Sequence, residues 1–580
     1  MRGALAAFAW ALAHAQPITV VDLQGAPPPA TVLAVQVCAG LMNRSPALSG
    51  FAYTLMHPED SAWLAIVQPA APAPTPIAPF LARCLATPGL AAGYILYNFS
   101  AQQVTVPNLL TLAAVLDAVP LEPGSPYLPP ALPLAYDALA QWANWSALQA
   151  TAFMFAAYAN RTSTLAKMNP GLDVHAHPLD PPLTLLPDLS LADFIVSQRL
   201  FNFFLAQGCI PGTPEHALME AMAQRGPWPR PIAVYGYDDT LPLFGGDTFE
   251  AETNCVAEHS MGQIASTGVN NLAFFAAHAP PLTEPLLQPP PTLPPGTPFN
   301  ASASYVTLVV GDGDNLAMVK SSRFAWFQAR VSACAGPQAQ DAGAPAGAGA
   351  AAAGASCYPL SWTLSPALQR DAPELARWYF AGAARTQRDY FVLPPSGHLY
   401  SYPGSLQPGD AQAFVRATES DAALYNASAT VDWEWVGTWA RTIANFTPRY
   451  AERGVITALF AVNVPYLLPI AEFGVGEEFK VVGGRVVLFQ GNEWRGDSGA
   501  AAPGLHPFLR NASEVAAGLL GAPRGTVSAI YLTSDGGGSV AMLDALAALL
   551  QGTHVQIVDA GTQSRMAIAS QGRGGGGGST

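Results

Sequence analysis

Lysine is almost missing from this chain, which has only Lys167, Lys320 and Lys480 among its 580 residues. Acidic side chains outnumber basic ones, and the formal net charge is -14. A nucleic-acid-binding protein needs clustered cations to displace the counterions of the phosphate backbone. The composition therefore excludes nucleic acid as a partner.

Long apolar runs are also missing after the first residues, so we predict no membrane span. Residues 1–15, MRGALAAFAWALAHA, place one cation before a short apolar stretch and end in a small-x-small pattern. This arrangement is typical of a secretory signal peptide cleaved after Ala15. We therefore expect a secreted or extracellular protein.

Several catalytic motifs are absent as well. The chain has no Gly-x-Ser-x-Gly elbow and no phosphate-binding loop, which leaves serine hydrolase and nucleotide-binding functions without support. None of the six cysteines has metal-ligand spacing. We predict disulfides between nearest neighbours instead. Cys334 and Cys357 bracket a segment with almost nothing to bury, and a disulfide at its base would close that loop.

Sequons for N-linked glycosylation are frequent. Asn-x-Ser/Thr occurs at Asn43, Asn98, Asn144, Asn160, Asn300, Asn426, Asn445 and Asn511. The sequon at Asn43 is the poorest because Pro46 follows it. The other seven asparagines are predicted to be exposed and to carry N-linked glycans, since a glycan cannot be attached inside a core.

The strongest domain boundary is a proline-rich stretch. Residues 279–298 contain nine prolines, which keep the backbone extended and out of any sheet ladder. We predict an N-terminal α/β domain (16–277), a Pro-rich linker (278–300), a C-terminal domain (301–562) and a disordered Gly-rich tail (563–580).

Strand-like and helix-like segments alternate in both domains, which predicts an α/β fold. In the N-terminal half we expect strands at 17–23, 93–98 and 231–237, and helices at 30–43, 108–119 and 191–208. In the C-terminal half we expect strands at 304–311, 389–396, 454–462, 485–491, 526–534 and 554–560, with helices at 410–424 and 540–551. Several of these strands are apolar throughout, as in a parallel sheet covered on both faces. We favour a β/α barrel, closed or incomplete, over an open sheet.

Carboxylates and rings recur where these strands end. The first strand of the C-terminal half runs into GDGDN, in which Asp312, Asp314 and Asn315 lie in a turn opened by Gly311 and Gly313. Two carboxylates at this spacing suit an acid/base site or a hard-cation site. The alternative is a polar turn that caps the next helix.

Later strand ends supply further candidates. The catalytic candidates are Asp312, Asp314, Glu434, Glu493 and Asp535. The candidates for substrate binding are Asn315, Trp362, His398, Tyr400, Tyr402, Trp433 and Trp494. Sugars suit this mixture, because their C–H faces stack on rings while their hydroxyls bond to carboxylates and amides, and glycoside hydrolysis needs two carboxyl groups. The alternative for the tryptophans is an ordinary core position.

The segment GHLYSYP (397–403) resembles the Gly-x-Gly-Tyr-x-Tyr-Pro pattern that names the GxGYxYP family of putative glycoside hydrolases. Gly397, Tyr400, Tyr402 and Pro403 match, and Leu399 replaces a glycine. YVTLVVGDGDNL, LSWTLSP, DYFVLPPSG and AGLMNRSP (39–46) are similar to other segments of the family in order and spacing. The resemblance implies two domains and a carbohydrate substrate.

Three functions follow from these observations. The first is a secreted glycoside hydrolase that uses carboxylate acid/base chemistry. The second is a carbohydrate-binding or cell-surface protein without activity. The third is a metal-dependent hydrolase such as a glycan deacetylase. We predict no cofactor for the first two, whereas the third would place a divalent cation at Asp312 and Asp314.

Overall fold

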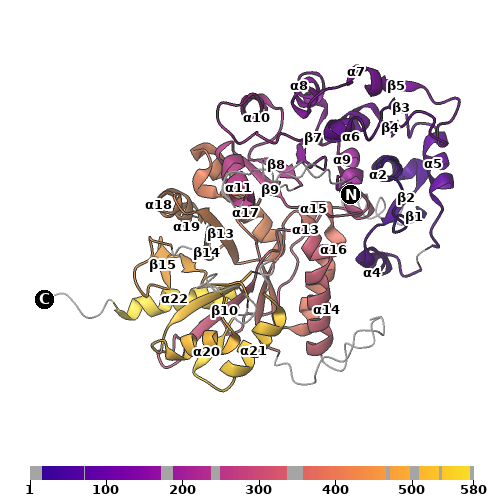
Figure 1. Ribbon diagram of the computed structural model, residues 1–580. Coiled ribbons are helices and arrows are strands. Elements are labelled where there is room, and N and C mark those ends of the chain that lie inside the picture. Colours follow the sequence, from indigo (N-terminus) through magenta and orange to yellow (C-terminus); the bar gives the residue numbers. More distant parts are fainter. Residues whose placement is uncertain are drawn as a thin grey trace, which may run out of the picture. The chain divides into compact units, whose positions relative to one another are not determined.

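The computed structural model describes residues 16–70, 72–171, 187–236, 248–335, 357–452, 454–464, 470–496, 509–533 and 538–574. The chain forms two compact units (Figure 1). Unit 1 comprises residues 1–281 and 368–374, and unit 2 comprises residues 282–367 and 375–580. The predicted signal peptide (1–15) and Asp535 lie outside the described residues. None of the described helices is both long enough and apolar enough to cross a membrane.

Unit 1 contains three small parallel sheets, β1-β2, β4-β3-β5 and β7-β6-β8-β9. Its strands are β1 (Ile18–Asp22), β2 (Phe51–Leu55), β3 (Gly93–Leu96), β4 (Ala118–Leu121), β5 (Leu134–Asp137), β6 (Leu165–Lys167), β7 (Phe201–Phe203), β8 (Ile232–Tyr235) and β9 (Met261–Ile264). Its helices are α2 (Pro29–Arg44), α3 (Pro46–Ser49), α4 (Pro58–Val67), α5 (Ile77–Ala86), α6 (Val106–Leu116), α7 (Ala138–Gln141), α8 (Ala147–Tyr158), α9 (Ala192–Gln198), α10 (Pro214–Arg225), α11 (Thr248–Glu258), α12 (Leu272–His278) and α15 (Leu368–Asp371), with 3-10 turns η1 (Gln103–Thr105) and η2 (Ala159–Arg161).

Two features of unit 1 differ from the sequence-based expectation. The helix predicted over 191–208 ends at Gln198, because Arg199 adopts a left-handed conformation (φ 52°) and strand β7 follows. The short segment 368–374, expected in the C-terminal domain, belongs to unit 1. There the Tyr235 hydroxyl donates to Asp371 Oδ2 (2.5 Å), and His278 Nδ1 lies 3.0 Å from Glu374 Oε1.

Unit 2 contains two larger sheets in the order β12-β11-β10-β18-β17, with β19 also paired to β10, and β13-β14-β16-β15. Its strands are β10 (Ser304–Val310), β11 (Leu360–Thr363), β12 (Asp389–Val392), β13 (Ala429–Trp435), β14 (Ala458–Val464), β15 (Phe479–Val482), β16 (Val486–Gln490), β17 (Glu493–Trp494), β18 (Val527–Leu532) and β19 (Val555–Ile557). Its helices are α13 (Leu316–Lys320), α14 (Ser322–Cys334), α16 (Pro373–Thr386), α17 (Pro408–Tyr425), α18 (Trp439–Arg441), α19 (Thr447–Glu452), α20 (Ala512–Gly521), α21 (Val540–Leu550) and α22 (Ala560–Gly574), with a 3-10 turn η4 (Pro403–Ser405) and a π-helical turn η5 (Thr442–Phe446).

The strands of unit 2 are parallel except for the pairing of β15 with β16. The mixed α/β class is therefore confirmed, whereas a barrel is not. The two sheets are joined by an isolated bridge between Leu393 and Thr430 and by a bond from Tyr531 N to Gly491 O (2.9 Å). Helices α14 and α16 lie side by side (Figure 1), and Phe327 packs against Trp378 and Tyr379 at their contact.

The ends of unit 2 also differ from expectation. The tail predicted to be disordered from residue 563 is helical as far as Gly574. The reason is that α22 has an apolar face, with Met566 and Ala567 buried beside Thr562 and Gln563. The Pro-rich linker has no helix or strand of its own between α12 and β10, as predicted, but it is bound to unit 2. For example, Phe391 N donates to Gln288 Oε1 (2.9 Å) and Thr292 N to Asp559 Oδ2 (2.7 Å).

The predicted cysteine pairing is confirmed. Disulfides join Cys38 to Cys84, Cys209 to Cys255 and Cys334 to Cys357.

The predicted exposure of the sequons also agrees with the structure. Five asparagines are exposed (Asn144, Asn160, Asn300, Asn426 and Asn445), and Asn98 and Asn511 are half-buried. Asn43 is buried, and its side chain bonds to the backbone of Ala52 in both directions.

Candidate functional site

The GDGDN turn lies where the sequence placed it, directly after the central strand β10. The two glycines, Gly311 and Gly313, allow atoms of neighbouring strands to approach the turn closely. A Cβ on Gly311 would lie 2.4 Å from the Tyr531 hydroxyl, and one on Gly313 would lie 1.9 Å from the Thr363 carbonyl oxygen. The left-handed residue is Asp312 itself (φ 58°). A non-glycine residue held in that conformation costs about 1–3 kcal/mol and is often found at functional sites.

Strand pairing places Glu493, another predicted catalytic residue, at the same edge of the sheet as Asp312 and Asp314. Glu493 begins β17 and is paired in register with Tyr531 of β18, and Tyr531 is paired with Val309 of β10. Burial raises the Tyr531 pKa, and the charges of Asp312, Asp314 and Glu493 add to this effect. The Asp312 backbone N–H donates to that hydroxyl (3.4 Å). We call Asp312, Asp314, Glu493 and Tyr531 the acidic cluster.

Glu493 is a carboxylate of the acidic cluster whose pKa is raised by burial. Burial raises its pKa to about 7, and the charge of Asp312 adds to this effect. Arg495 Nε (2.7 Å) and the Thr533 hydroxyl (2.7 Å) both donate to Oε1 and act in the opposite direction. Oε2 accepts no hydrogen bond from the described part of the chain, so this oxygen can present a proton to a substrate.

Arg323 lies beneath the acidic cluster and was not found from the sequence. It is buried, and its guanidinium donates to the carbonyl oxygens of Gly311 and, at 2.6 Å, of Thr363. Burial lowers its pKa, while the charges of Asp312 and Asp314 raise it. Arg323 therefore fixes the ends of β10 and β11 and balances the carboxylates. Neither Arg323 nor Tyr531 belongs to a local motif, so only the fold reveals them: Tyr531 through strand pairing and Arg323 through the contacts of α14.

Glu434, another of the predicted catalytic carboxylates, lies on strand β13 of the other sheet. It shares one face of β13 with Asp432, since side chains alternate along a strand, whereas Trp433 on the other face contacts Tyr531 (ring centroids 6.1 Å). Glu434 accepts from Gly404 N (2.6 Å) and from the Thr438 hydroxyl (2.6 Å). It therefore anchors the GHLYSYPG loop to β13.

Burial raises the pKa of Glu434 to about 7, and burial together with Glu434 raises that of Asp432. An acid whose pKa is raised by folding binds its proton more tightly in the native state. Stability from the Glu434 carboxyl is therefore present below the unfolded pKa of about 4 and is lost as pH rises through about 7.

We expect Glu434→Gln to raise the free energy of unfolding at pH 8 by about 1–3 kcal/mol, because it removes a buried charge. The gain should vanish near pH 4. Urea unfolding at both pH values measures it. If Glu434 lies outside the chemistry of the site, this variant should keep the activity of the wild type. A loss of activity without a change in stability would return Glu434 to its predicted catalytic role.

The rings predicted to bind substrate form a continuous buried group. Tyr400 contacts Trp433 (5.6 Å between centroids) and Tyr402 (6.3 Å), and Tyr402 contacts Trp435 (6.4 Å). Tyr400, Tyr402 and Trp433 are all buried. The rings of the GHLYSYPG loop therefore pack against Trp433, which in turn contacts Tyr531. A sugar-stacking role for these rings stays a prediction.

The remaining candidates have structural partners. Trp362 Nε1 donates to Asp389 Oδ1 (2.8 Å), and Trp494 Nε1 donates to Arg510 O (2.7 Å); both rings are buried. His398 Nδ1 lies 2.7 Å from Asp421 Oδ2 on α17. Asn315 caps α13 by accepting from Ala317 N (3.0 Å) and Met318 N (3.3 Å). These contacts agree with the core and capping alternatives at those positions.

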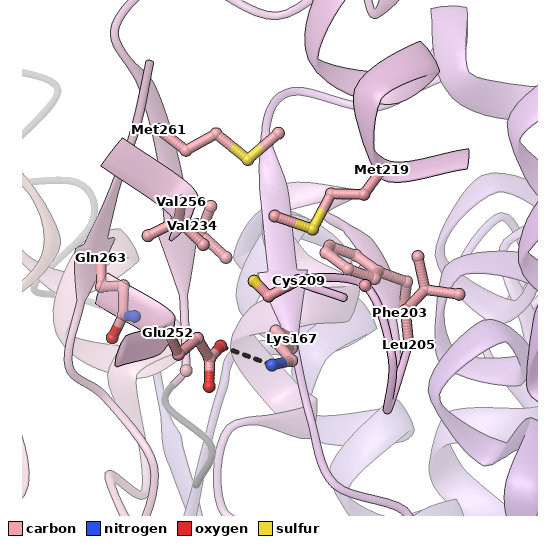
Figure 2. A pocket seen from close by; sticks show the side chains of 12 residues that line it. Lys167, Phe203, Leu205, Cys209, Met219, Val234, Glu252, Val256, Met261 and Gln263 are labelled. Carbon is pink, nitrogen blue, oxygen red and sulfur yellow. Dashed lines mark hydrogen bonds and ion pairs between the residues drawn. The ribbon is translucent and has the colours of Figure 1, made fainter. Parts of the chain in front are cut away.

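A separate cavity lies in unit 1. Figure 2 shows Lys167 paired with Glu252 among the apolar side chains that line it, including Phe203, Met219 and Met261. The centre of a water molecule can occupy about 20 Å³ of this cavity. That volume is enough for about one water. The cavity is too small for a sugar ring.

Comparison with known proteins agrees with the sequence-based resemblance. Residues 353–458 match the GxGYxYP putative glycoside hydrolase C-terminal domain. The match agrees with the predicted resemblance over this segment, which includes the GHLYSYPG loop, β11 to β13 and Glu434. The acidic cluster draws its carboxylates from outside the matched GxGYxYP segment. No curated protein matches the chain.

Two solved structures are similar. The first is a "putative hydrolase" from Bacteroides thetaiotaomicron VPI-5482, with a TM-score of 0.69 and 16% identity over 96% of this chain and 95% of that one. It shares the fold. The second is a "putative polysaccharide deacetylase" from Mycobacterium smegmatis, with a TM-score of 0.29 and 13% identity over 50% of this chain and 96% of that one. A likeness this distant supports no inference.

Proposed function

We propose that this protein is a secreted glycoside hydrolase that cleaves a poly- or oligosaccharide with Glu493 as general acid. The observation that carries the proposal is a buried carboxyl with a pKa raised to about 7, beside Asp312 at the ends of parallel strands. Proteins with parallel α/β sheets bind ligands at the C-terminal ends of the strands. A general acid needs a pKa near the working pH, and burial next to a like charge provides one.

Each member of the acidic cluster has a distinct part in the proposed reaction. Glu493 donates its proton to the glycosidic oxygen as the bond to the leaving sugar breaks. Asp314, which is half-buried and so better solvated, stays ionised as nucleophile or base. Burial, with a smaller contribution from the charge of Asp312, keeps the proton on Glu493. The Tyr531 hydroxyl stays protonated, because its pKa is raised, and can donate a hydrogen bond to the sugar.

Secretion and glycosylation belong to the same proposal. Three disulfides suit an oxidising compartment, and five of the seven sequon asparagines are exposed. We also propose that the strands of unit 2 surround the cluster as a barrel that is closed by single backbone links.

The proposal is tested by incubating the glycosylated protein with a panel of polysaccharides, half of them acetylated. We expect new reducing ends, no release of acetate, and no effect of EDTA. Binding without any product would favour the inactive carbohydrate-binding alternative. Release of acetate that is lost with EDTA would favour a deacetylase with a divalent cation at Asp312 and Asp314.

A further inference from the structure

A group of metal-ligand side chains in unit 1 lies outside the proposed active site. His216, Glu220 and His259 each offer one donor atom, and these atoms all lie within 4.8 Å of one another. They are the only such group of three or more among the residues that the structure describes. We propose that this group binds a zinc ion and that the ion joins helix α10 to the end of helix α11.

The backbone presents two of the ligands from one helix face. His216 and Glu220 are four residues apart on α10, so their side chains lie one turn apart on the same side. Thr213 caps this helix by accepting from His216 N (3.1 Å), which fixes the turn that carries the first ligand. The buried residues Met219 and Met222 hold the other side of α10 in the core. Glu220 is exposed and His216 half-buried, so an ion can reach them from solvent.

A hydrogen bond of the third ligand, His259, shows which of its ring nitrogens carries the proton. His259 Nδ1 lies 2.9 Å from the carbonyl oxygen of Cys255. A carbonyl oxygen only accepts, so Nδ1 carries the proton and Nε2 keeps its lone pair for a metal. Metal-binding histidines usually make this kind of outer hydrogen bond, which orients the ring. The His216 and His259 rings are 5.6 Å apart between centroids.

A disulfide holds the two sides of the site together. Cys255, which accepts the hydrogen bond from His259, is bonded to Cys209, which lies shortly before α10. The disulfide therefore limits the separation of α10 and α11 before any ion binds. Preorganisation of this kind lowers the entropy cost of bringing ligands from two helices to one ion.

The donor set selects the metal. Two imidazoles and one carboxylate suit zinc, whereas calcium and magnesium prefer oxygen ligands alone. Zinc bonds of about 2.0–2.2 Å at tetrahedral angles place donor atoms about 3.3–3.5 Å apart. The exposed Glu220 side chain can move to close the remaining gap. Three protein ligands leave one position for water.

The test uses full-length protein without a histidine tag, stripped with EDTA and titrated with Zn²⁺ in a calorimeter. We expect one ion per chain. Glu220→Gln should weaken binding by at least about 10–100-fold, the loss caused by removing even an outer-shell partner, and His216→Ala with His259→Ala should abolish it. Co²⁺ in place of zinc should give the intense visible bands of a four-coordinate ion.

Two controls separate a built site from an adventitious one. Glu258→Gln removes an exposed carboxylate adjacent to His259 that bonds to Asn254 (3.1 Å), and it should leave the affinity unchanged. Zinc should raise the unfolding temperature of the wild type and of Glu258→Gln, and not that of Glu220→Gln. Equal affinity in all variants, or weak pale Co²⁺ bands in the wild type, would overturn the proposal.

Discussion

Glu493→Gln should lower kcat/KM on the polysaccharide substrate by about 10²–10⁴-fold, the usual contribution of a general acid. Glutamine keeps the size of the side chain and can still accept from Arg495 and Thr533 through its amide oxygen. It has no acidic proton to give to the leaving oxygen. The fold should therefore survive while the chemistry is lost, and kcat should fall with little change in KM.

The pH profile of the wild type gives a second readout. Glu493 must be protonated to act, so activity should fall as pH rises through about 7, the value to which burial raises its pKa. Asp312→Asn removes a negative charge that raises this pKa, so the alkaline limb should move to lower pH. The residual activity of Glu493→Gln should show no alkaline limb at all. Initial rates at subsaturating substrate between pH 4 and pH 9 measure these profiles.

Glu419→Gln is the matched control for this experiment. Burial also raises the pKa of Glu419, and its Oε2 accepts from Val455 N (2.6 Å) and Ile456 N (3.2 Å). It lies on α17, away from the acidic cluster. The activity and pH profile of the Glu419→Gln variant should match those of the wild type. A wild-type rate in Glu493→Gln would remove Glu493 from the mechanism and leave Asp314 to be tested by Asp314→Asn.

The sequence predicted the strands that carry the site because buried parallel strands are apolar throughout. The expected strand 304–311 is β10, and 526–534 contains β18. It also placed Asp312 at the end of a central strand. It could not show which carboxylates meet, because this depends on β17 and β18 pairing beside β10 across long stretches of chain. Tyr531 was missed for the same reason, and Arg323 was missed because its contacts with Gly311 and Thr363 depend on the packing of α14.

Period-two alternation within β13 explains the different position of Glu434. The sequence WEW places two rings around a carboxylate, and a ring that packs toward Tyr531 turns the carboxylate to the other face. The alternation along β13 could be predicted from the sequence. Which of its two faces meets the acidic cluster could not. Similarly, no helix was predicted over residues 214–225, so the pairing of His216 with Glu220 was missed, and the approach of His259 required the fold and the disulfide.

Gly313→Ala should destabilise unit 2 by about 3–5 kcal/mol or prevent its folding, which is a large effect for one methyl group. The added Cβ would lie 1.9 Å from the carbonyl oxygen of Thr363 and 2.3 Å from its carbonyl carbon. Both atoms belong to the backbone of β11, so no side-chain rotation relieves the contact.

Moving Thr363 would break further bonds at once. Gly313 N donates to Thr363 Oγ1 (2.9 Å), Thr363 Oγ1 donates to Val310 O (2.8 Å), and Arg323 donates to Thr363 O (2.6 Å). The turn that carries Asp312 and Asp314 is therefore tied to β11 by the same residue that would clash. Any molecules that fold should have a displaced acidic cluster and should lose activity as well.

Gly518→Ala is the matched control, since Gly518 lies within helix α20 and a Cβ there would meet nothing within 4 Å. Alanine in place of a helix glycine should stabilise the protein by about 0.5–1 kcal/mol. Urea midpoints from circular dichroism, together with the soluble yield, compare the two variants. A wild-type midpoint for Gly313→Ala would mean that β11 and the GDGDN turn do not pack this closely, and the placement of Asp312 beside Glu493 would lose its support.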